Sequence, residues 1–195
     1  MKNRYLKNKA HLTKNFSYNK EMEHEACGVG LIASTNGEKS RKVVEYGIEA
    51  LKAVWHRGAV DADGKTGDGA GIHIEIPYDF FVEKIETKGH KHDSSEICVG
   101  MVFLPRNNFN AQENCKILVE KELTQNNFKI YGWRQVPINT KVLGEKANSN
   151  RPEITQILFK CNDRKIIDKA LERKLYEIRR KIEKEIISNN LENFY

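Results

Sequence analysis

Apolar positions along the chain follow two spacings, and together these predict a mixture of strands and helices. Short apolar runs bounded by turn-forming residues predict strands at residues 27–34, 72–76, 97–104, 128–136 and 154–159, with the opening of another at 191–195. Apolar residues three and four positions apart predict helices at 40–56, 78–86, 111–123 and 163–188, with Ser40 and Asp163 as N-caps. Strands separated by turns or helices indicate an α+β fold whose sheet is buried on at least one face.

Three segments show neither spacing. Residues 58–71 contain five glycines and three aspartates, and loops of this length without regular structure are usually functional or mobile. Residues 139–152 are polar and are predicted to form a loop or insertion. Residues 1–26 have no apolar period and end in acidic residues, so we interpret them as a leader that packs poorly.

The composition describes a globular chain of 195 residues, 39% hydrophobic and 31% charged, for which one domain is the better expectation. Its formal charge of +6 is spread along the chain without interleaved aromatic residues, which argues against nucleic acid as a partner. No apolar run approaches the roughly 18 residues of a membrane span, so no membrane partner is expected. Four cysteines without a CxxC pair indicate reduced thiols and a cytoplasmic protein. Since residues 1–20 are basic and lack acids, an organelle transit segment stays an open alternative.

Cys27 heads the apolar run Cys27–Ala33 and is the first candidate for chemistry. If the leader is removed, Cys27 gains a free α-amine, whose ordinary pKa of roughly 7.7 to 8.0 lets it accept the thiol proton at neutral pH. Nucleophile and base would then belong to one residue. The alternative is an inert thiol buried in a core strand.

Arg57 stands before Gly58 at the start of the glycine-rich segment and is the second candidate. A guanidinium can hold a carboxylate through two parallel hydrogen bonds, and a glycine beside it leaves room for a substrate against the backbone. The alternative is a solvated arginine that interacts with a helix C-terminus.

Two motif matches within residues 58–71 fail on inspection. Gly64-Lys65-Thr66 resembles the end of a phosphate-binding loop, but the first required glycine is replaced by Ala59. Asp61 and Asp63 are spaced as in a calcium loop, but Lys65 occupies the third ligand position. A nucleotide-binding function therefore remains only a third hypothesis.

Other candidate ligands favour structural roles. His90 and His92 could bind a metal, but histidine pairs in polar loops are mostly solvent-exposed and no cage of further ligands is evident. Cys98, Cys115 and Cys161 lie in apolar strand or helix patterns, which predicts that they fill the core.

Three stretches of sequence together indicate a family. The segments EACGVGLIA and HRGAVDADGKTGDGAGIHIEIP, followed late in the chain by LERKLYEIRRKIEKEI, resemble the N-terminal class II glutamine amidotransferase domain of glutamate synthase large subunits. The similarity covers residues 23–195. The aspartate–glycine segment is its most specific part, because other class II amidotransferases share the cysteine and the arginine–glycine pair but lack this segment.

The resemblance implies an N-terminal nucleophile hydrolase fold, in which two antiparallel sheets lie between helical layers in a four-layer αββα arrangement. It implies that residues 1–26 are a propeptide and that 27–195 are the N-terminal part of the domain. Cys27 would be the nucleophile and its freed amine the base. Arg57 would bind the α-carboxylate of glutamine, with Gly58, Gly67, Asp68 and Gly69 near the pocket.

The resemblance also implies partners and cofactors. Glutamine is the expected substrate, and the ammonia would pass to a synthase domain in the remaining part of the large subunit, with a small subunit as a further candidate partner. We expect no cofactor in this chain, and FMN and an iron–sulfur cluster in the complete enzyme.

The family's oxyanion element, an asparagine–glycine pair, and a later substrate-binding aspartate have no matching segment before Tyr195. We therefore expect an incomplete domain with little glutaminase activity by itself, because one oxyanion donor is worth about 10² to 10³ in rate. The alternative is a non-catalytic fragment or pairing subunit of the same fold that needs a further chain.

Overall fold

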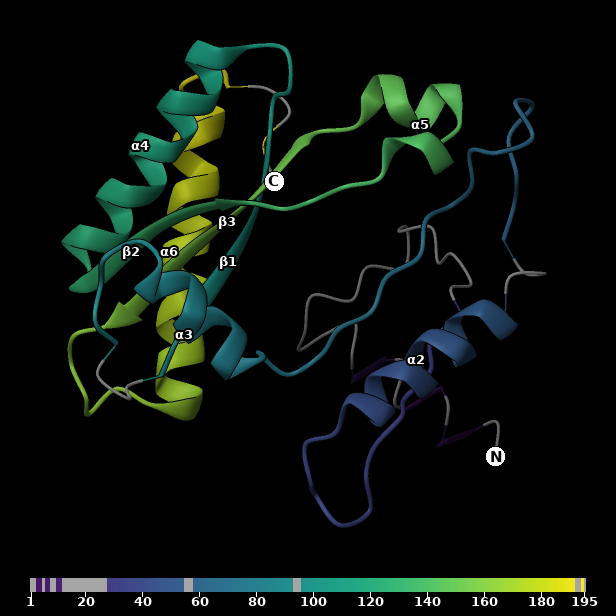
Figure 1. Ribbon diagram of the computed structural model, residues 1–195, viewed down its shortest axis with the longest axis horizontal. Coiled ribbons are helices and arrows are strands. Elements are labelled where there is room, and N and C mark those ends of the chain that lie inside the picture. The colour runs from purple at the N-terminus through teal and green to yellow at the C-terminus, as the bar shows by residue number, and fades with distance from the viewer. Residues whose placement is uncertain are drawn as a thin grey trace. The chain divides into compact units, whose positions relative to one another are not determined.

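The computed structural model describes residues 28–54, 58–92 and 96–191, together with residues 3, 4, 6, 7, 10, 11 and 194. The chain divides into two compact units, Met1–Arg57 and Gly58–Tyr195. Figure 1 traces both units and labels their helices and strands. Among the described helices, none is long and apolar enough to span a bilayer.

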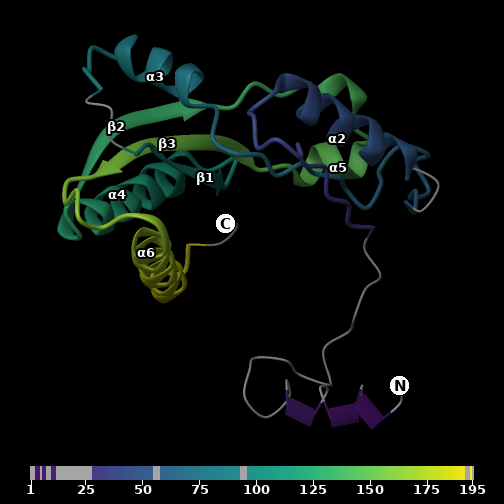
Figure 2. The same ribbon diagram turned by 90° about the horizontal axis from the view of Figure 1, so that it is seen from below.

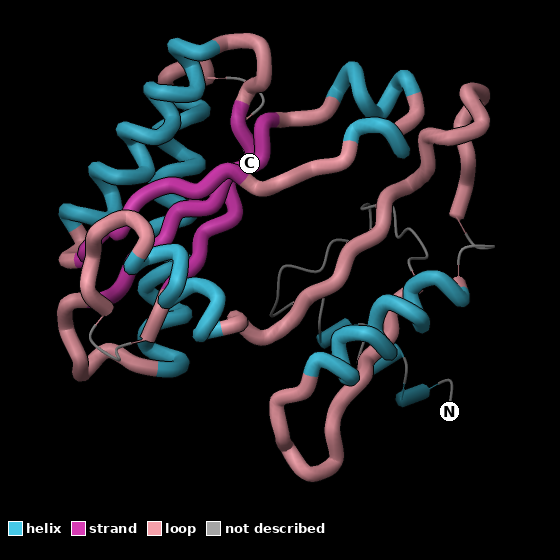
Figure 3. The backbone as a smooth tube through the Cα atoms, in the orientation of Figure 1, coloured by secondary structure: helices cyan, strands magenta, loops and turns pink. Residues whose placement is uncertain are grey.

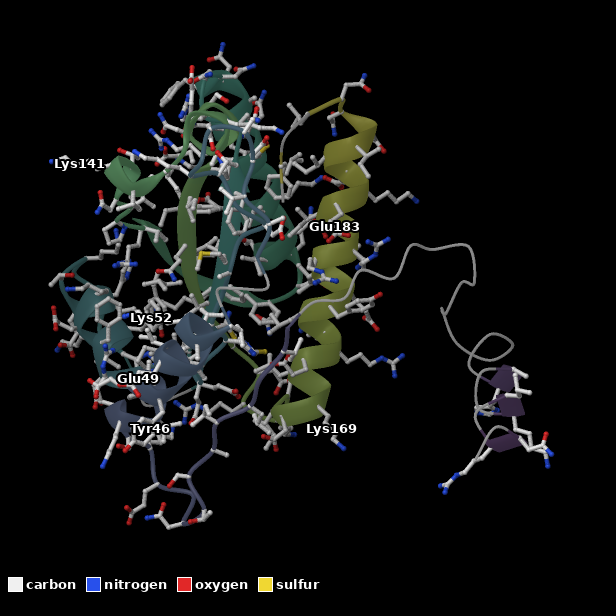
Figure 4. All side chains as sticks on the ribbon, turned by 90° about the vertical axis from the view of Figure 1, so that its right-hand side faces the viewer. Tyr46, Glu49, Lys52, Lys141, Lys169 and Glu183 are labelled. Atoms are coloured by element: carbon white, nitrogen blue, oxygen red, sulfur yellow. The ribbon has the colours of Figure 1, made fainter. Side chains whose placement is uncertain are left out.

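The first unit contains helix α2 (Arg41–Ala53), which begins where the sequence predicts. The Ser40 hydroxyl accepts a hydrogen bond from the Lys42 amide at 3.2 Å and caps the helix. Polar side chains such as Glu49 and Lys52 project from this helix in Figure 4.

The strand predicted at 27–34 is wrong for its described part. Residues 28–34 have no regular structure and form a loop in Figure 3. The side chains of Val29 and Leu31 are 92% and 89% exposed. An apolar run becomes a strand only when a neighbouring strand pairs with its backbone, and no described segment does so here. Cys27 itself lies outside the described residues.

The second unit is organised on a three-stranded antiparallel sheet of β1 (Cys98–Leu104), β2 (Phe128–Gln135) and β3 (Glu153–Cys161), in the order β1-β3-β2. The strands pair in register from Cys98 opposite Phe159 to Leu104 opposite Glu153, and from Phe128 opposite Cys161. β3 pairs on both sides, and its centre is buried on both faces. All three strands are confirmed, and so is the α+β class.

Helices cover the two faces of this sheet, as Figure 2 shows. On one face lie α4 (Phe109–Gln125) and α6 (Asp168–Ser188), and on the other lies α3 (Tyr78–Glu86). The larger core, between the sheet and the α4–α6 pair, includes Val102, Cys115, Val119, Leu123, Ile157, Phe159, Ile178 and Ile182. The smaller core, under α3, consists of Phe81, Ile85, Ile97, Tyr131 and Leu158.

A β-bulge in β2 determines which of its side chains face the larger core. The register shifts between Ile130 and Gly132, so Tyr131 is an extra residue. In a regular strand Ile130 and Trp133 would face opposite sides, because they are three positions apart. The bulge places both against the larger core, whereas Tyr131 faces the smaller one.

The exposed face of α6 carries charged side chains, as the sequence predicts. Arg173 pairs with Glu177 at 3.1 Å and Arg179 with Glu183 at 3.3 Å, both one helical turn apart. Lys169 and Glu183 are labelled on this helix in Figure 4.

Three further predictions need correction. Residues 72–76 form no strand, and the side chain of Ile74 is 43% exposed. Among the described residues, no strand pairs with this segment. Asp163 does not cap α6: its carboxylate accepts a hydrogen bond from the Lys165 amide in a separate turn, and the helix begins at Asp168. The predicted loop at 139–152 contains the 3₁₀ helix η2 (Thr140–Val142) and helix α5 (Glu145–Asn150).

The strand opening predicted at 191–195 lies mostly outside the described residues. Leu191 is not in a strand, and with Phe194 it packs against the larger core.

Leu158 tests the importance of β3 for stability. Its side chain is fully buried, so Leu158→Ala should lower the free energy of unfolding by about 2 to 5 kcal/mol in urea denaturation followed by circular dichroism. Met101→Ala on β1, where the side chain is 49% exposed, is the matched control and should cost less than about 1 kcal/mol. Equal losses in both variants would contradict this description of the core.

Candidate functional site

The structure describes only part of the predicted site. Cys27 and Arg57 both lie outside the described residues, so their roles stay predictions. Gly58, Gly67, Asp68 and Gly69 are described, and all four belong to the segment 58–71, which we call the glycine–aspartate loop. As predicted, this segment has almost no regular secondary structure.

Hydrogen bonds close the glycine–aspartate loop at its base. The Asp68 carboxylate accepts a hydrogen bond from the Ala59 amide at 2.9 Å. Val60 and Gly67 form an antiparallel bridge, and the Asp61 amide donates to the Thr66 carbonyl at 2.7 Å. The structure thus brings Gly58–Ala59 and the Gly67–Gly69 turn together, although seven residues separate Ala59 from Gly67. Gly69 has a φ of 86°, a left-handed conformation that favours glycine.

Asp63 organises the tip of the loop. Its carboxylate accepts hydrogen bonds from the amides of Lys65 at 2.9 Å and Thr66 at 2.7 Å, and from the Thr66 hydroxyl at 2.5 Å. These donors favour the ionised form, and the Thr66 hydroxyl has the largest effect in holding the pKa of Asp63 below its usual value. The tip is therefore a structured turn centred on one carboxylate.

A distant segment holds the loop from outside. The Lys146 ammonium donates to the Asp61 carboxylate at 2.5 Å, and the Ala147 amide donates to the Thr66 hydroxyl at 3.3 Å. The Lys146 contact, followed by the Ala62 amide, holds the pKa of Asp61 below its usual value. Both donors belong to α5, so the 139–152 segment is more than an insertion.

Gly144, just before α5, fits tightly against the same loop. It is buried, and a Cβ added there would lie 2.6 Å from the Thr66 amide nitrogen and closer still to the Thr66 and Asp63 side chains. The sequence offers only a glycine as a signal for this contact, because Gly144 and Thr66 are far apart in the chain.

The geometry of the tip does not support the nucleotide-binding hypothesis. A phosphate-binding loop offers its backbone amides to the ligand. Here the amides of Lys65 and Thr66 already donate to Asp63, and no helix follows the loop directly.

The candidate metal ligands instead pack against a buried tyrosine. The His92 ring nitrogen Nδ1 lies 3.1 Å from the Tyr131 hydroxyl, and His90 contacts the same ring edge to face. Within the described ranges, no three His, Cys, Asp or Glu side chains are grouped to hold a metal ion.

The three described cysteines are core residues, as predicted. Cys98, Cys115 and Cys161 are buried and free. Burial raises the pKa of Cys98 to about 12 and also raises the pKa of Cys115. Neither thiol is activated as a nucleophile at neutral pH, because reactivity belongs to the thiolate.

The described part of the site can orient a ligand but supplies no activated nucleophile. The glycine–aspartate loop offers backbone groups and carboxylates whose positions are fixed by hydrogen bonds. Cys27, the predicted nucleophile, lies outside the described residues.

Comparisons with known proteins give a family and relatives. A family profile described as class-II glutamine amidotransferases matches residues 27–195. The glutamate synthase (NADPH) large chain of Azospirillum brasilense is 54% identical over 188 residues, which is 96% of this chain and 12% of the relative. Ferredoxin-dependent glutamate synthase of Cyanidium caldarium is 41% identical over 165 residues, covering 84% of this chain and 10% of the relative. The corresponding protein of Pyropia yezoensis is 38% identical over 167 residues, 85% of this chain and 10% of the relative. This chain therefore spans about a tenth of the length of these relatives.

The hydrogen bonds of Asp63 predict how the loop responds to pH. Because its pKa is lowered from 3.8 in the folded protein, the carboxylate stabilises the loop fully above that value, and this stability is lost as the pH falls through the lower folded pKa. In an NMR titration, the Lys65 and Thr66 amide resonances should stay fixed from pH 7 to about 4 and shift only below that. Asp63→Ala should abolish the acid transition at these two amides. A midpoint above 3.8 in the unchanged chain would contradict the assignment.

Proposed function

Since the chain belongs to the class II glutamine amidotransferases, we propose that it is the glutamine-hydrolysing part of a glutamate synthase large subunit. The observation that carries this proposal is the 54% identity over 188 residues with a glutamate synthase large chain. The match includes the motif that begins at Cys27 and the glycine–aspartate loop, which lie within the family match at residues 27–195.

The proposed reaction begins at Cys27. After removal of residues 1–26, the α-amine of Cys27 takes the thiol proton, and the sulfur adds to the side-chain amide carbon of glutamine. The C–N bond then breaks, and the leaving nitrogen takes a proton and departs as ammonia. Water hydrolyses the remaining glutamyl thioester, which releases glutamate and restores the thiol.

Arg57 and the glycine–aspartate loop are proposed to hold the substrate. The Arg57 guanidinium would pair with the α-carboxylate of glutamine, and Gly58, Gly67, Asp68 and Gly69 would line the pocket. The contact of Asp68 with the Ala59 amide supports this proposal, because it fixes the two loop segments against each other. Preorganised binding groups reduce the entropy lost when a substrate is bound.

The finer fold is part of the proposal. We infer that residues 27–195 contribute to a four-layer αββα arrangement with two antiparallel sheets. The described sheet would supply strands of one of these sheets, and α4 and α6 would belong to its helical layer.

Ammonia would be used elsewhere in the complete protein. There a synthase domain would combine it with 2-oxoglutarate, with FMN and an iron–sulfur cluster supplying the reducing electrons. The described residues of this chain do not fit such a cluster, since their cysteines are buried in the core and no metal-binding group is present among them. We propose a cytoplasmic location, with the rest of the large subunit and a small subunit as partners.

A specific observation favours the alternative of a fragment that needs a further chain. Val29, Leu31 and Ile74 are exposed apolar side chains in segments whose sequence predicts strands. These segments would be buried if additional strands paired with them. In that case this chain alone would bind or hydrolyse glutamine poorly, and activity would return when the missing chain is supplied.

Cys27→Ser in the full-length gene product tests the proposed function. The serine hydroxyl is a much weaker nucleophile than the thiol, so ammonia release from glutamine should fall about 10³-fold or more. Cys115→Ala is the matched control because its thiol is buried in the core, and it should keep kcat within about twofold. Unchanged ammonia release in Cys27→Ser would refute the proposal.

A further inference from the structure

The contact between α5 and the glycine–aspartate loop is the longest-range polar contact that this loop makes among the described residues. Lys146 and Asp61 are 85 positions apart in the sequence, and Ala147 and Thr66 are 81 apart. Both pairs lie in the second unit, Gly58–Tyr195. Figure 1 shows α5 on the connection between β2 and β3, beyond the end of the sheet.

The connection gives α5 a fixed base. α5 ends at Asn150 and β3 begins at Glu153, so few residues separate it from the central strand of the sheet. The Arg106 guanidinium, just after β1, also donates a hydrogen bond to the Asn148 carbonyl at 2.8 Å. α5 is therefore attached to the sheet at two points, through the chain and through Arg106.

Three neighbouring residues contact the glycine–aspartate loop, each through a different interaction. Lys146 pairs with Asp61 by charge, Ala147 donates a backbone hydrogen bond to Thr66, and Gly144 allows the two backbones to approach closely. Thr66 is the shared partner, because its hydroxyl also donates to Asp63 at the tip of the loop. A displacement of α5 would thus alter the contacts of Asp61, Asp63 and Thr66 together.

We infer that residues 144–147 are a clamp that sets the geometry of the glycine–aspartate loop and, through it, the affinity for glutamine. Lys146 and Gly144 are positioning residues in this account, because they act through the loop and do not touch the substrate. The inference rests on the proposed function, in which Gly67, Asp68 and Gly69 line the substrate pocket.

The expected change in glutamine affinity depends on how exposed the Lys146–Asp61 ion pair is. The side chain of Lys146 is 67% exposed and that of Asp61 is 36% exposed, so solvent screens their attraction. We therefore expect a moderate change in glutamine affinity when Lys146 is removed. Gly144 is buried and has no room for a Cβ, so its substitution should have a larger effect.

The primary test is hydrogen exchange on this chain with Lys146→Met. Amide exchange in residues 59–68 should accelerate by about twofold to fivefold, because the loop opens more often without the ion pair. Lys141→Met is the matched control: Lys141 lies in η2 on the same connection, is exposed and points away from the protein in Figure 4. It should leave exchange in the loop unchanged. Equal exchange in the two variants would overturn the clamp.

Kinetics on the full-length gene product test the consequence for the substrate. Lys146→Met should raise the KM for glutamine about twofold to fivefold and leave kcat within about twofold, since the reacting atoms are untouched. Lys146→Arg keeps the charge and should restore most of the affinity. Gly144→Ala should raise KM further, whereas Lys141→Met should change neither parameter.

The outcomes separate this inference from the proposed function. Faster loop exchange with an unchanged KM, in a protein that hydrolyses glutamine, would overturn the positioning role alone. A fall in kcat equal to the rise in KM would also overturn it, because a clamp on the binding loop acts on affinity. Failure of the unsubstituted full-length gene product to release ammonia would refute the proposed function, while the exchange comparison on this chain would still decide whether the clamp exists.

Discussion

The pairing of β3 with a strand on each side is the constraint on which the rest of the second unit depends. Because β3 is hydrogen-bonded to β1 and β2 and buried on both faces, each helix of the core has to pack against it or its neighbours. α4 and α6 cover one face and α3 covers the other. The bulge at Tyr131 lets the edge strand β2 place both Ile130 and Trp133 against the larger core. β3 also anchors α5, so the sheet is connected physically to the glycine–aspartate loop.

This connection gives the loop an unusual combination of composition and order. A segment with five glycines would be expected to sample many conformations, since glycine restricts the backbone least. Glycines have no side chains to pack, and here the Asp63 and Asp68 carboxylates hold the loop by accepting hydrogen bonds from backbone amides. Helix α5, which is not part of the loop, adds a further contact. The glycines then allow close approach of backbone to backbone, while the aspartates fix the conformation. Such a loop suits a binding role, because it is polar, accessible and held in place.

The sequence predicted most elements of the core, and the reasons for its successes and errors are physical. Apolar spacing predicts strands β1, β2 and β3 and helices α2, α3 and α4. It does so because each of these elements buries one face or stripe of its own side chains, which leaves a periodic pattern within the segment. Residues 28–34 and 72–76 carry the same apolar signal, but a strand also needs a paired neighbour, which spacing does not report. The start of α6 was misplaced because Asp163 forms a local turn as readily as a helix cap. The contact of Lys146 with Asp61 produces no periodic pattern in the sequence, since 85 positions separate the two.

Cys27 and Arg57 were identified by motif, and their assignments rest on that motif and on the family match.

The most direct test of the proposed chemistry is to trap the covalent intermediate. The full-length gene product would be mixed with glutamine, quenched in acid within milliseconds, digested with pepsin at acid pH to keep the thioester on sulfur, and analysed by peptide mass spectrometry. The account predicts a peptide that begins at Cys27, without residues 1–26, and that carries a glutamyl group on its sulfur which disappears on treatment with hydroxylamine. An active enzyme whose glutamyl group is found on another residue, or whose Cys27 peptide still carries the preceding residues, would contradict it.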